Sequence, residues 1–296
     1  MKTDLYRQVT DSIVAQLEAG VQPWFRPWSV QGRASRPLRS TGQEYRGINV
    51  LLLWVSALEK GYASPFWFSY KQASEIGAQV RKGECGTTVV YFGTMERTET
   101  GQDGEDVDYQ IPFLKGYHVF NADQIDGLPK AFTAEPQPVE TYDNRRIAVA
   151  EAFVKGTGAD IRHGGDSAFY RRSDDYIQMP EFDRFQDEKH YYATILHELG
   201  HYSGAERRLN RRFDGSGRFG GEGYAMEELV CELTACFLAA DLGLYVEPRA
   251  DHASYLASWL KALRADRRAI FTAASHAQKA ADYLHGLQAQ ALSDVA

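Results

Sequence analysis

The sequence of 296 residues predicts an α+β fold in two parts. Apolar residues recur at helical spacing in several segments, β-branched and aromatic residues gather in a pair of segments, and a proline-rich stretch separates the halves. A chain of this length has room for two domains, and with 44% hydrophobic and 25% charged residues each can bury a core. We expect domains at 1–128 and 143–296, joined by a linker at 129–142.

The first half is expected to hold three helices and two paired strands. The predicted helices span 3–19, 49–58 and 69–76. The predicted strands are TTVVYFGT, at 87–94, and YQIPFLKGYHVFN, at 109–121. Residues 99–108 contain five acids and no base, and we expect them to form an exposed loop between the strands.

The second half is expected to be mainly helical. The predicted helices span 143–156, 189–203 and 224–240, with further helical segments towards the end. Short strands are predicted at 168–171 and 176–179. We expect the segment DDYIQMP, which ends at Pro180, to be an edge strand that aligns an extended peptide.

Three cysteines, Cys85, Cys231 and Cys236, form an odd set without CxxC spacing. This excludes a disulfide framework and a thiolate zinc site, and it favours a reducing cytoplasm. The sequence shows neither a signal peptide nor an apolar stretch of membrane-spanning length, so we expect a cytoplasmic protein without a membrane partner.

The net charge of −7 hides an uneven distribution. Lysine and arginine outnumber the acids in residues 1–98. The acidic segment 99–108 offsets part of this positive charge when the net charge of the whole chain is counted. The first half is therefore locally basic, which keeps nucleic acid among its expected partners.

A metal site is predicted at HELGH, residues 197–201. His197 and His201 stand four residues apart, so on a helix both imidazoles project from one face and can hold one ion. Glu198 follows the first ligand, where its carboxylate can accept a proton from an attacking water. These residues predict a zinc-dependent hydrolase with Glu198 as its general base.

The third ligand is expected on a later helix. A metzincin would have histidine at position 207, where this chain has Arg207. In YAMEELVCEL the acids Glu227, Glu228 and Glu232 lie among large aliphatic residues, so an inward carboxylate needs a partner. We predict the gluzincin arrangement, with Glu228 as ligand and Glu232 as acceptor for the free N–H of a ligand histidine. Glu227 and Glu232 are the alternative ligands.

A hydrolytic site also needs a donor that stabilises the oxyanion. The sequence offers several candidates and does not choose among them: Tyr224, Arg207, Tyr176 and His252.

The first half interleaves aromatic and basic residues, the types that bind the bases and phosphates of single-stranded DNA. PWFRPW, at 23–28, is the densest example. The residues expected to contact single-stranded DNA are Trp24, Phe25, Arg26, Trp28, Arg46, Asn49, Trp67, Tyr70, Lys71, Arg81 and Lys82.

The whole chain resembles the ArdC-type antirestriction proteins of conjugative plasmids. The matching segments are PWFRPW, YRGIN, FWFSYKQA, GAQVRKGECGTTVVYF, VFNADQIDGLP, AFYRRSDDYIQMP, HELGH and YAMEELVCEL. The segments of the first half are more specific to this family than HELGH. Cys231 departs from the pattern, because a small residue such as alanine is expected there.

The resemblance implies an N-terminal α+β domain that binds single-stranded DNA and a C-terminal zincin-like metallopeptidase domain of the gluzincin type. It implies that the protein binds single strands without strong sequence preference and helps incoming plasmid DNA escape restriction. Zn²⁺ is the expected metal, with Mn²⁺ as the alternative, and a host protein is a candidate substrate.

Two other functions suit the same residues. One is a zinc metalloprotease whose first half regulates it or recognises its substrate. The other is a DNA-binding protein with a structural metal, which the intact Glu198 disfavours, because a structural site needs no base.

Overall fold

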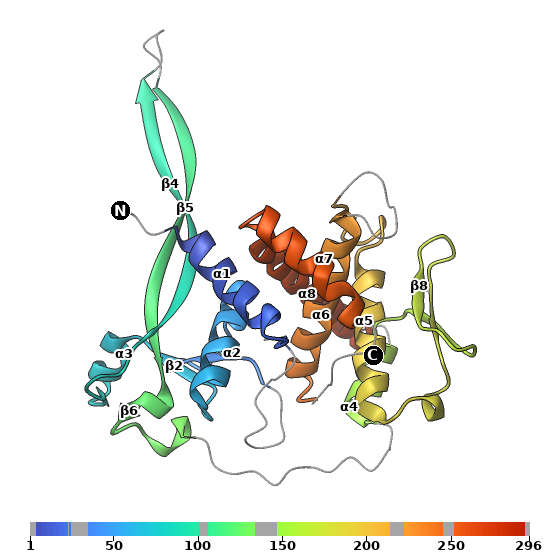
Figure 1. Ribbon diagram of the computed structural model, residues 1–296, viewed down its shortest axis with the longest axis horizontal. Coiled ribbons are helices and arrows are strands. Elements are labelled where there is room, and N and C mark those ends of the chain that lie inside the picture. The colour runs from blue at the N-terminus through green and yellow to red at the C-terminus, as the bar shows by residue number, and fades with distance from the viewer. Residues whose placement is uncertain are drawn as a thin grey trace.

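The computed structural model describes residues 4–22, 24, 35–100, 106–133, 147–213, 222–244 and 252–293, and Figure 1 shows their arrangement. The α+β class is confirmed. The helices are α1 (Leu5–Glu18), α2 (Ile48–Lys60), α3 (Tyr70–Glu75), α4 (Ala148–Gly156), α5 (Glu188–Ser203), α6 (Glu222–Asp241), α7 (His252–Ala265) and α8 (Ala269–Ser293). Each predicted helix thus has a counterpart in the structure. The strands are β1 (Leu38–Arg39), β2 (Phe66–Phe68), β3 (Gln79–Val80), β4 (Thr87–Thr100), β5 (Asp106–Asn121), β6 (Ile125–Asp126), β7 (Asp160–His163), β8 (Phe169–Arg171) and β9 (Tyr176–Met179).

The larger sheet of the first half has the strand order β1-β2-β5-β4. Strands β4 and β5 pair from Thr87 opposite Val119 to Thr100 opposite Asp106, and they form a long hairpin that projects from the body (Figure 1). The acidic loop is therefore shorter than predicted. Strand-favouring residues lie at both ends of the acidic stretch, Thr98 and Thr100 on β4 and Val107 and Tyr109 on β5, and they favour continued strand pairing; residues 101–105 lie outside the described residues.

The small sheet of the second half has the strand order β7-β9-β8. Strand β9 pairs with β7 in parallel and with β8 in antiparallel orientation. The prediction that DDYIQMP forms an edge strand is therefore wrong, because both of its edges are already paired and cannot accept a peptide. The edges of this sheet belong to β7 and β8.

The two halves share one hydrophobic core. Trp54 of α2 packs edge-to-face on Phe237 of α6, with ring centroids 5.9 Å apart. Arg36, only 3% exposed, donates hydrogen bonds to Asp241 at 2.5 and 2.9 Å and to Gln278 at 2.8 Å. Helix α1 also packs against α7. The halves are therefore joined by apolar packing as well as by a buried ion pair.

The predicted linker at 129–142 is only partly described. Its first residues belong to the first half, because the ring of Phe132 packs edge-to-face against Phe66 and Phe68. Residues 134–146 lie outside the described residues, and the domain boundaries stay a prediction. Among the described helices, we find none with the length and apolar character that a membrane crossing requires.

Candidate functional site

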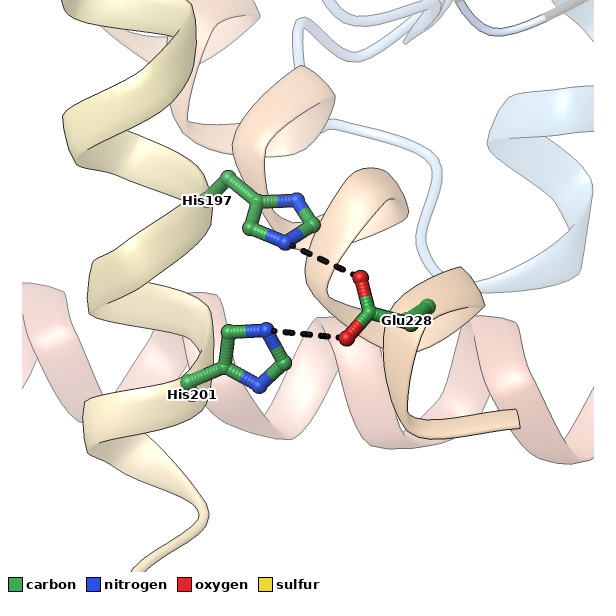
Figure 2. Close-up of side chains that lie close together, drawn as sticks. All are labelled: His197, His201 and Glu228. Atoms are coloured by element: carbon green, nitrogen blue, oxygen red, sulfur yellow. Dashed lines mark ion pairs between the residues drawn. The ribbon is translucent and has the colours of Figure 1, made fainter. Parts of the chain in front are cut away.

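Helix α5 carries the first two predicted ligands on one face. It begins after Asp187, whose side chain accepts a hydrogen bond from the main-chain N–H of His190. His197 and His201 follow one turn apart, with ring centroids separated by 4.9 Å. His197 is buried and His201 half-buried, and both rings point towards α6 (Figure 2).

Glu228 of α6 lies between the two imidazoles, as Figure 2 shows. Its Oε2 atom lies 3.5 Å from Nε2 of His197, and its Oε1 atom lies 3.4 Å from Nε2 of His201. Two ligand atoms at about 2.1 Å from a tetrahedral ion are about 3.4 Å apart. The spacing and the donor set, two imidazole nitrogens and one carboxylate, therefore suit a single zinc-like ion.

The Glu228 side chain is buried, which opposes ionisation, but His197 and His201 lower its pKa below the ordinary value. The site therefore presents a carboxylate, which is the form that binds a cation.

A carboxylate stands behind each histidine. Nδ1 of His197 lies 2.9 Å from Oε1 of Glu232, and Nδ1 of His201 lies 3.4 Å from Oε1 of Glu227. An acceptor at Nδ1 fixes the tautomer in which Nε2 is available to a metal. Glu232 thus lies close to Nδ1 of His197, and its role as acceptor stays a prediction; Glu227 lies beside Nδ1 of the second histidine.

Arg211 belongs to this cluster and was not found from the sequence. Its guanidinium is buried and donates hydrogen bonds to both oxygens of Glu227, at 2.8 and 2.7 Å, and to the main-chain oxygen of Gly200 at 2.8 Å. Burial raises the pKa of Glu227, but hydrogen bonds from His201 and Arg211 outweigh it and lower this pKa to about 2. The sequence contained one indication of such a residue: Glu227, next to Glu228, is an acid among aliphatic residues and needs a partner.

Two glycines allow this close packing. A Cβ atom on Gly200 would lie 3.0 Å from Cα of Cys231, so the glycine of HELGH lets α5 approach α6. A Cβ atom on Gly204 would lie 2.7 Å from Nη2 of Arg211. Both contacts help to set the distance between the histidines and the acids of α6.

The Cys231 thiol also contacts the site, which the sequence did not indicate. Its Sγ atom lies 3.2 Å from Nδ1 of His201, and burial raises its pKa to about 12, so the thiol is neutral. His201, Glu227 and Cys231 form a second set of candidate metal donors. The Arg211 guanidinium already lies against Glu227 and Cys231, and a cation there repels a metal ion.

Tyr224 is the oxyanion candidate that lies beside the ligands. Its hydroxyl is 3.1 Å from that of Tyr255. Burial and hydrogen bonds with Tyr255 and Glu228 raise its pKa, so it remains a phenol that can donate a proton in a hydrogen bond. Arg207 is exposed and pairs with Asp175, and Tyr176 is buried. The side chain of His252 lies outside the described residues.

Two aromatic residues predicted to bind DNA lie in the core. Trp24 is 0% exposed and packs edge-to-face on Trp259. Trp67 is 1% exposed and packs in the same way on Tyr62. Neither ring has a face open to a base, which corrects their assignment to a DNA surface; burying such large apolar rings stabilises the fold. Phe25, Arg26 and Trp28 lie outside the described residues.

Asn49 has a structural role. Its side-chain amide donates to the main-chain oxygen of Val90 and accepts from the main-chain nitrogen of Val90, both at 2.8 Å, so it holds α2 on β4. Arg46 is exposed and forms an ion pair with Asp282 of α8.

Four predicted DNA contacts lie at the surface: Tyr70, Lys71, Arg81 and Lys82. Arg81 pairs with Glu84 at 3.0 Å and Lys71 with Glu75 at 3.6 Å. The Lys71–Glu75 pair is exposed, so it costs little to exchange for a phosphate, whereas Glu84 is half-buried.

The hairpin carries an exposed surface that the sequence analysis missed. Side chains alternate along each strand, and the register places one set of large apolar residues together. We name it the aromatic face; it consists of Tyr91, Met95, Tyr109, Ile111, Phe113 and Tyr117. Lys115 shares this face, whereas Glu96 and Asp108 lie on the opposite one. Alternation in the predicted strands was the signal that could have found it.

Comparison with known protein families assigns both halves. Residues 3–120 match the family described as the N-terminal domain of anti-restriction factor ArdC. Residues 148–276 match the zincin-like metallopeptidase family.

Relatives match along almost the whole chain. Protein y4eC of Sinorhizobium fredii (strain NBRC 101917 / NGR234) is 48% identical over 295 residues, which cover 98% of this chain and 94% of that protein. The DNA primase TraC of Escherichia coli is 40% identical over 303 residues, which cover 96% of this chain but 27% of the primase. The likeness to the primase therefore concerns only part of that protein.

Two crystal structures of the ArdC protein from plasmid R388 have the same fold. The metal-free structure has a TM-score of 0.84 and 48% identity, and the Mn(II)-bound structure has a TM-score of 0.81 and 46% identity. In both cases the match covers 97% of this chain and 99% of the other.

Proposed function

Because the chain belongs to the family of ArdC antirestriction proteins, we propose that it protects incoming conjugative plasmid DNA from the restriction enzymes of the recipient. In this proposal the first half binds single-stranded DNA without sequence preference. The second half holds a divalent metal in a peptidase site.

The surface of the first half supports binding of single strands. The aromatic face offers rings on which bases can stack, and Lys115 adds a cation on the same side of the hairpin. Stacking on aromatic rings tolerates any base, and contacts with phosphates carry no sequence information. Binding of this kind is therefore expected to be strong at low salt and indifferent to sequence.

One observation carries the peptidase part of the proposal: His197, His201 and Glu228 converge as a three-ligand set. Zn²⁺ is the ion that these donors suit best; one solved relative binds Mn(II). A divalent ion held here acidifies a water molecule and polarises a carbonyl group.

The protein supplies the remaining groups. Glu198 is buried next to His197 in the helix and accepts the proton of the attacking water, then returns it to the leaving amine. Tyr224 donates a hydrogen bond to the oxygen that becomes negative. Glu232 and Glu227 hold the two histidines in the orientation that the ligand set needs.

A mating assay tests whether protection depends on DNA binding, on hydrolysis or on both. Transfer of an unmodified plasmid is counted in restricting and non-restricting recipients that make the wild-type protein, Glu198→Gln or the double variant Tyr91→Ser with Tyr117→Ser. We expect the double variant to lose protection together with its affinity for single-stranded oligonucleotides. Metal content and thermal unfolding are measured on each protein.

The exposed residues Glu181 and Val149 provide matched controls outside both surfaces, as Glu181→Gln and Val149→Ser. If Glu198→Gln binds metal and protects as well as the wild type, hydrolysis is not the means of protection. If the full-length protein shows no salt-sensitive affinity for single strands, the DNA-binding part of the proposal is wrong.

A further inference from the structure

A cavity of about 510 Å³ lies between the two halves and apart from the metal ligands. Its walls come from α1, the start of α2 and strand β4 on one side, and from α8 and the turn before it on the other. This volume is in the range of pockets that hold small organic ligands. Neither the ligands His197, His201 and Glu228 nor the aromatic face contributes to it.

One wall of the cavity is aromatic. The ring of Phe271 packs on Tyr6 with a centroid distance of 4.7 Å, and Phe92 lies 6.1 Å from Phe271 and 6.5 Å from Tyr6. Phe271 is buried, but Phe92 is 52% exposed. An apolar ring left half in water beside two others is a ready surface for a planar ligand.

The rim of the cavity is cationic. Arg46, Arg268 and Lys279 line it against one acid, Asp282. Arg46 pairs with Asp282, and the Arg268 guanidinium lies 5.0 Å from the ring centre of Tyr6. Among the described residues, neither Arg268 nor Lys279 has a carboxylate within ion-pairing distance. The cavity therefore has a positive excess in a chain whose net charge is −7.

We propose that this cavity binds a nucleotide, with the base on Phe92 and Tyr6 and the phosphate held by Arg268 and Lys279. Aromatic rings beside cations that have no carboxylate partner among the described residues form the combination that a nucleotide requires. Thr272 and Ser275, on the exposed side of α8, supply hydroxyls for the sugar or the edge of the base. Because the walls belong to both halves, a bound nucleotide also holds the halves together.

The nucleotide has two sources, a free mononucleotide or one unit of a single strand; the second rests on the proposed function. The full-length protein is titrated with dTMP by calorimetry and with a fluorescent oligothymidylate by anisotropy. The variants are Phe92→Ala and Lys279→Gln. The controls are Val149→Ala, an exposed apolar residue of α4, and Lys155→Gln, an exposed lysine of the same helix.

We expect Phe92→Ala to weaken binding at least about fivefold, which is the lower end of the contribution of one base stacked on an aromatic ring. We expect Lys279→Gln to weaken oligonucleotide binding and to reduce the slope of log affinity against log salt by roughly 0.7, as one lost phosphate contact on a single strand does. Neither control should change either quantity. Thermal unfolding confirms that each variant is folded.

The outcomes separate the two proposals. If the oligonucleotide binds and both variants keep wild-type affinity for both ligands, the cavity is not a nucleotide site, while binding of single strands stands. If only dTMP binds and the variants lose it, the cavity proposal stands and the proposed DNA binding fails. If the wild type binds neither ligand, both are wrong.

Discussion

Glu227 and Glu228 are neighbours in the chain, yet their carboxylates face opposite nitrogens of His201. Glu227 lies 3.4 Å from Nδ1, and Glu228 lies 3.4 Å from Nε2. Glu227 is bound to Arg211, whereas Glu228 is shared between the two histidines. The same substitution at these positions therefore has different consequences.

Glu228→Gln should abolish tight metal binding, because the neutral amide removes the one anionic donor of the set. We expect the affinity for Zn²⁺ to fall more than about 100-fold. This loss is larger than the loss caused by substituting a residue that hydrogen-bonds to a ligand. Metal competition titrations measure it, with the exposed Glu206→Gln as control. Unchanged affinity would move the third ligand to another acid.

Glu227→Gln should act mainly on stability. It leaves the buried Arg211 guanidinium without its carboxylate, and losing one partner of a buried ion pair costs about 3–5 kcal/mol. Urea unfolding in the presence of a chelator measures this cost without a metal contribution. A loss below about 1 kcal/mol would show that Arg211 is solvated by other groups.

Glu232→Gln should weaken metal binding without removing it. The carboxylate beside Nδ1 of His197 orients the ring and makes its other nitrogen a stronger metal ligand. Such partners typically raise metal affinity by roughly 10- to 100-fold. Competition titration gives the value, and circular dichroism confirms the fold. An affinity equal to that of the wild type contradicts this role.

Tyr224→Phe should retain the metal and lose about 100-fold in the turnover of any peptide substrate, as removal of one oxyanion donor does. Arg207→Gln is the matched control, because that side chain is exposed and paired with Asp175. The measurement compares turnover at saturating peptide with metal content. Equal turnover for Tyr224→Phe and wild type excludes the tyrosine from this role.

The Arg36–Asp241 pair predicts a pH dependence of stability. Burial opposes ionisation of Asp241, but His285 and Arg36 outweigh it and lower its pKa below the ordinary value. The stability from this group is therefore present above the unfolded pKa of about 3.9 and is lost as pH falls through the lower folded value.

Asp241→Asn should cost about 3 kcal/mol at pH 7, because the buried Arg36 loses the carboxylate that accepts two of its hydrogen bonds. The difference from the wild type should shrink progressively as pH falls below about 4. Urea unfolding at several pH values follows both quantities. A difference that is constant with pH would show that charge at Asp241 is not its cause.

The sequence predicted helices such as α1 well because they bury one face at helical spacing. Val9, Ile13 and Leu17 of α1 are all buried in the core, as their spacing indicates. The acids Glu228 and Glu232 could be found for a related reason, since charged groups among aliphatic residues must have partners.

Other features depended on contacts that no local pattern specifies. Arg211 reaches Glu227 from a loop, and only the packing of α5 on α6 brings them together. Tryptophan occurs both in hydrophobic cores and on surfaces that bind DNA. The burial of Trp24 and Trp67 could therefore not be inferred from residue type. Strand β9 had the right length, but its two neighbours were set by topology.

The core shared by the halves affects how the chain is made. Arg36 and its partner Asp241 are separated by 205 positions. Trp54 likewise packs on a residue made much later, Phe237 of α6. A ribosome delivers the first half well before α6 and α8. During this interval an apolar side of α2 has no partner, and the newly made segment is open to chaperones and proteases. The apolar side of α2 that faces α6 is therefore covered only after α6 has been made.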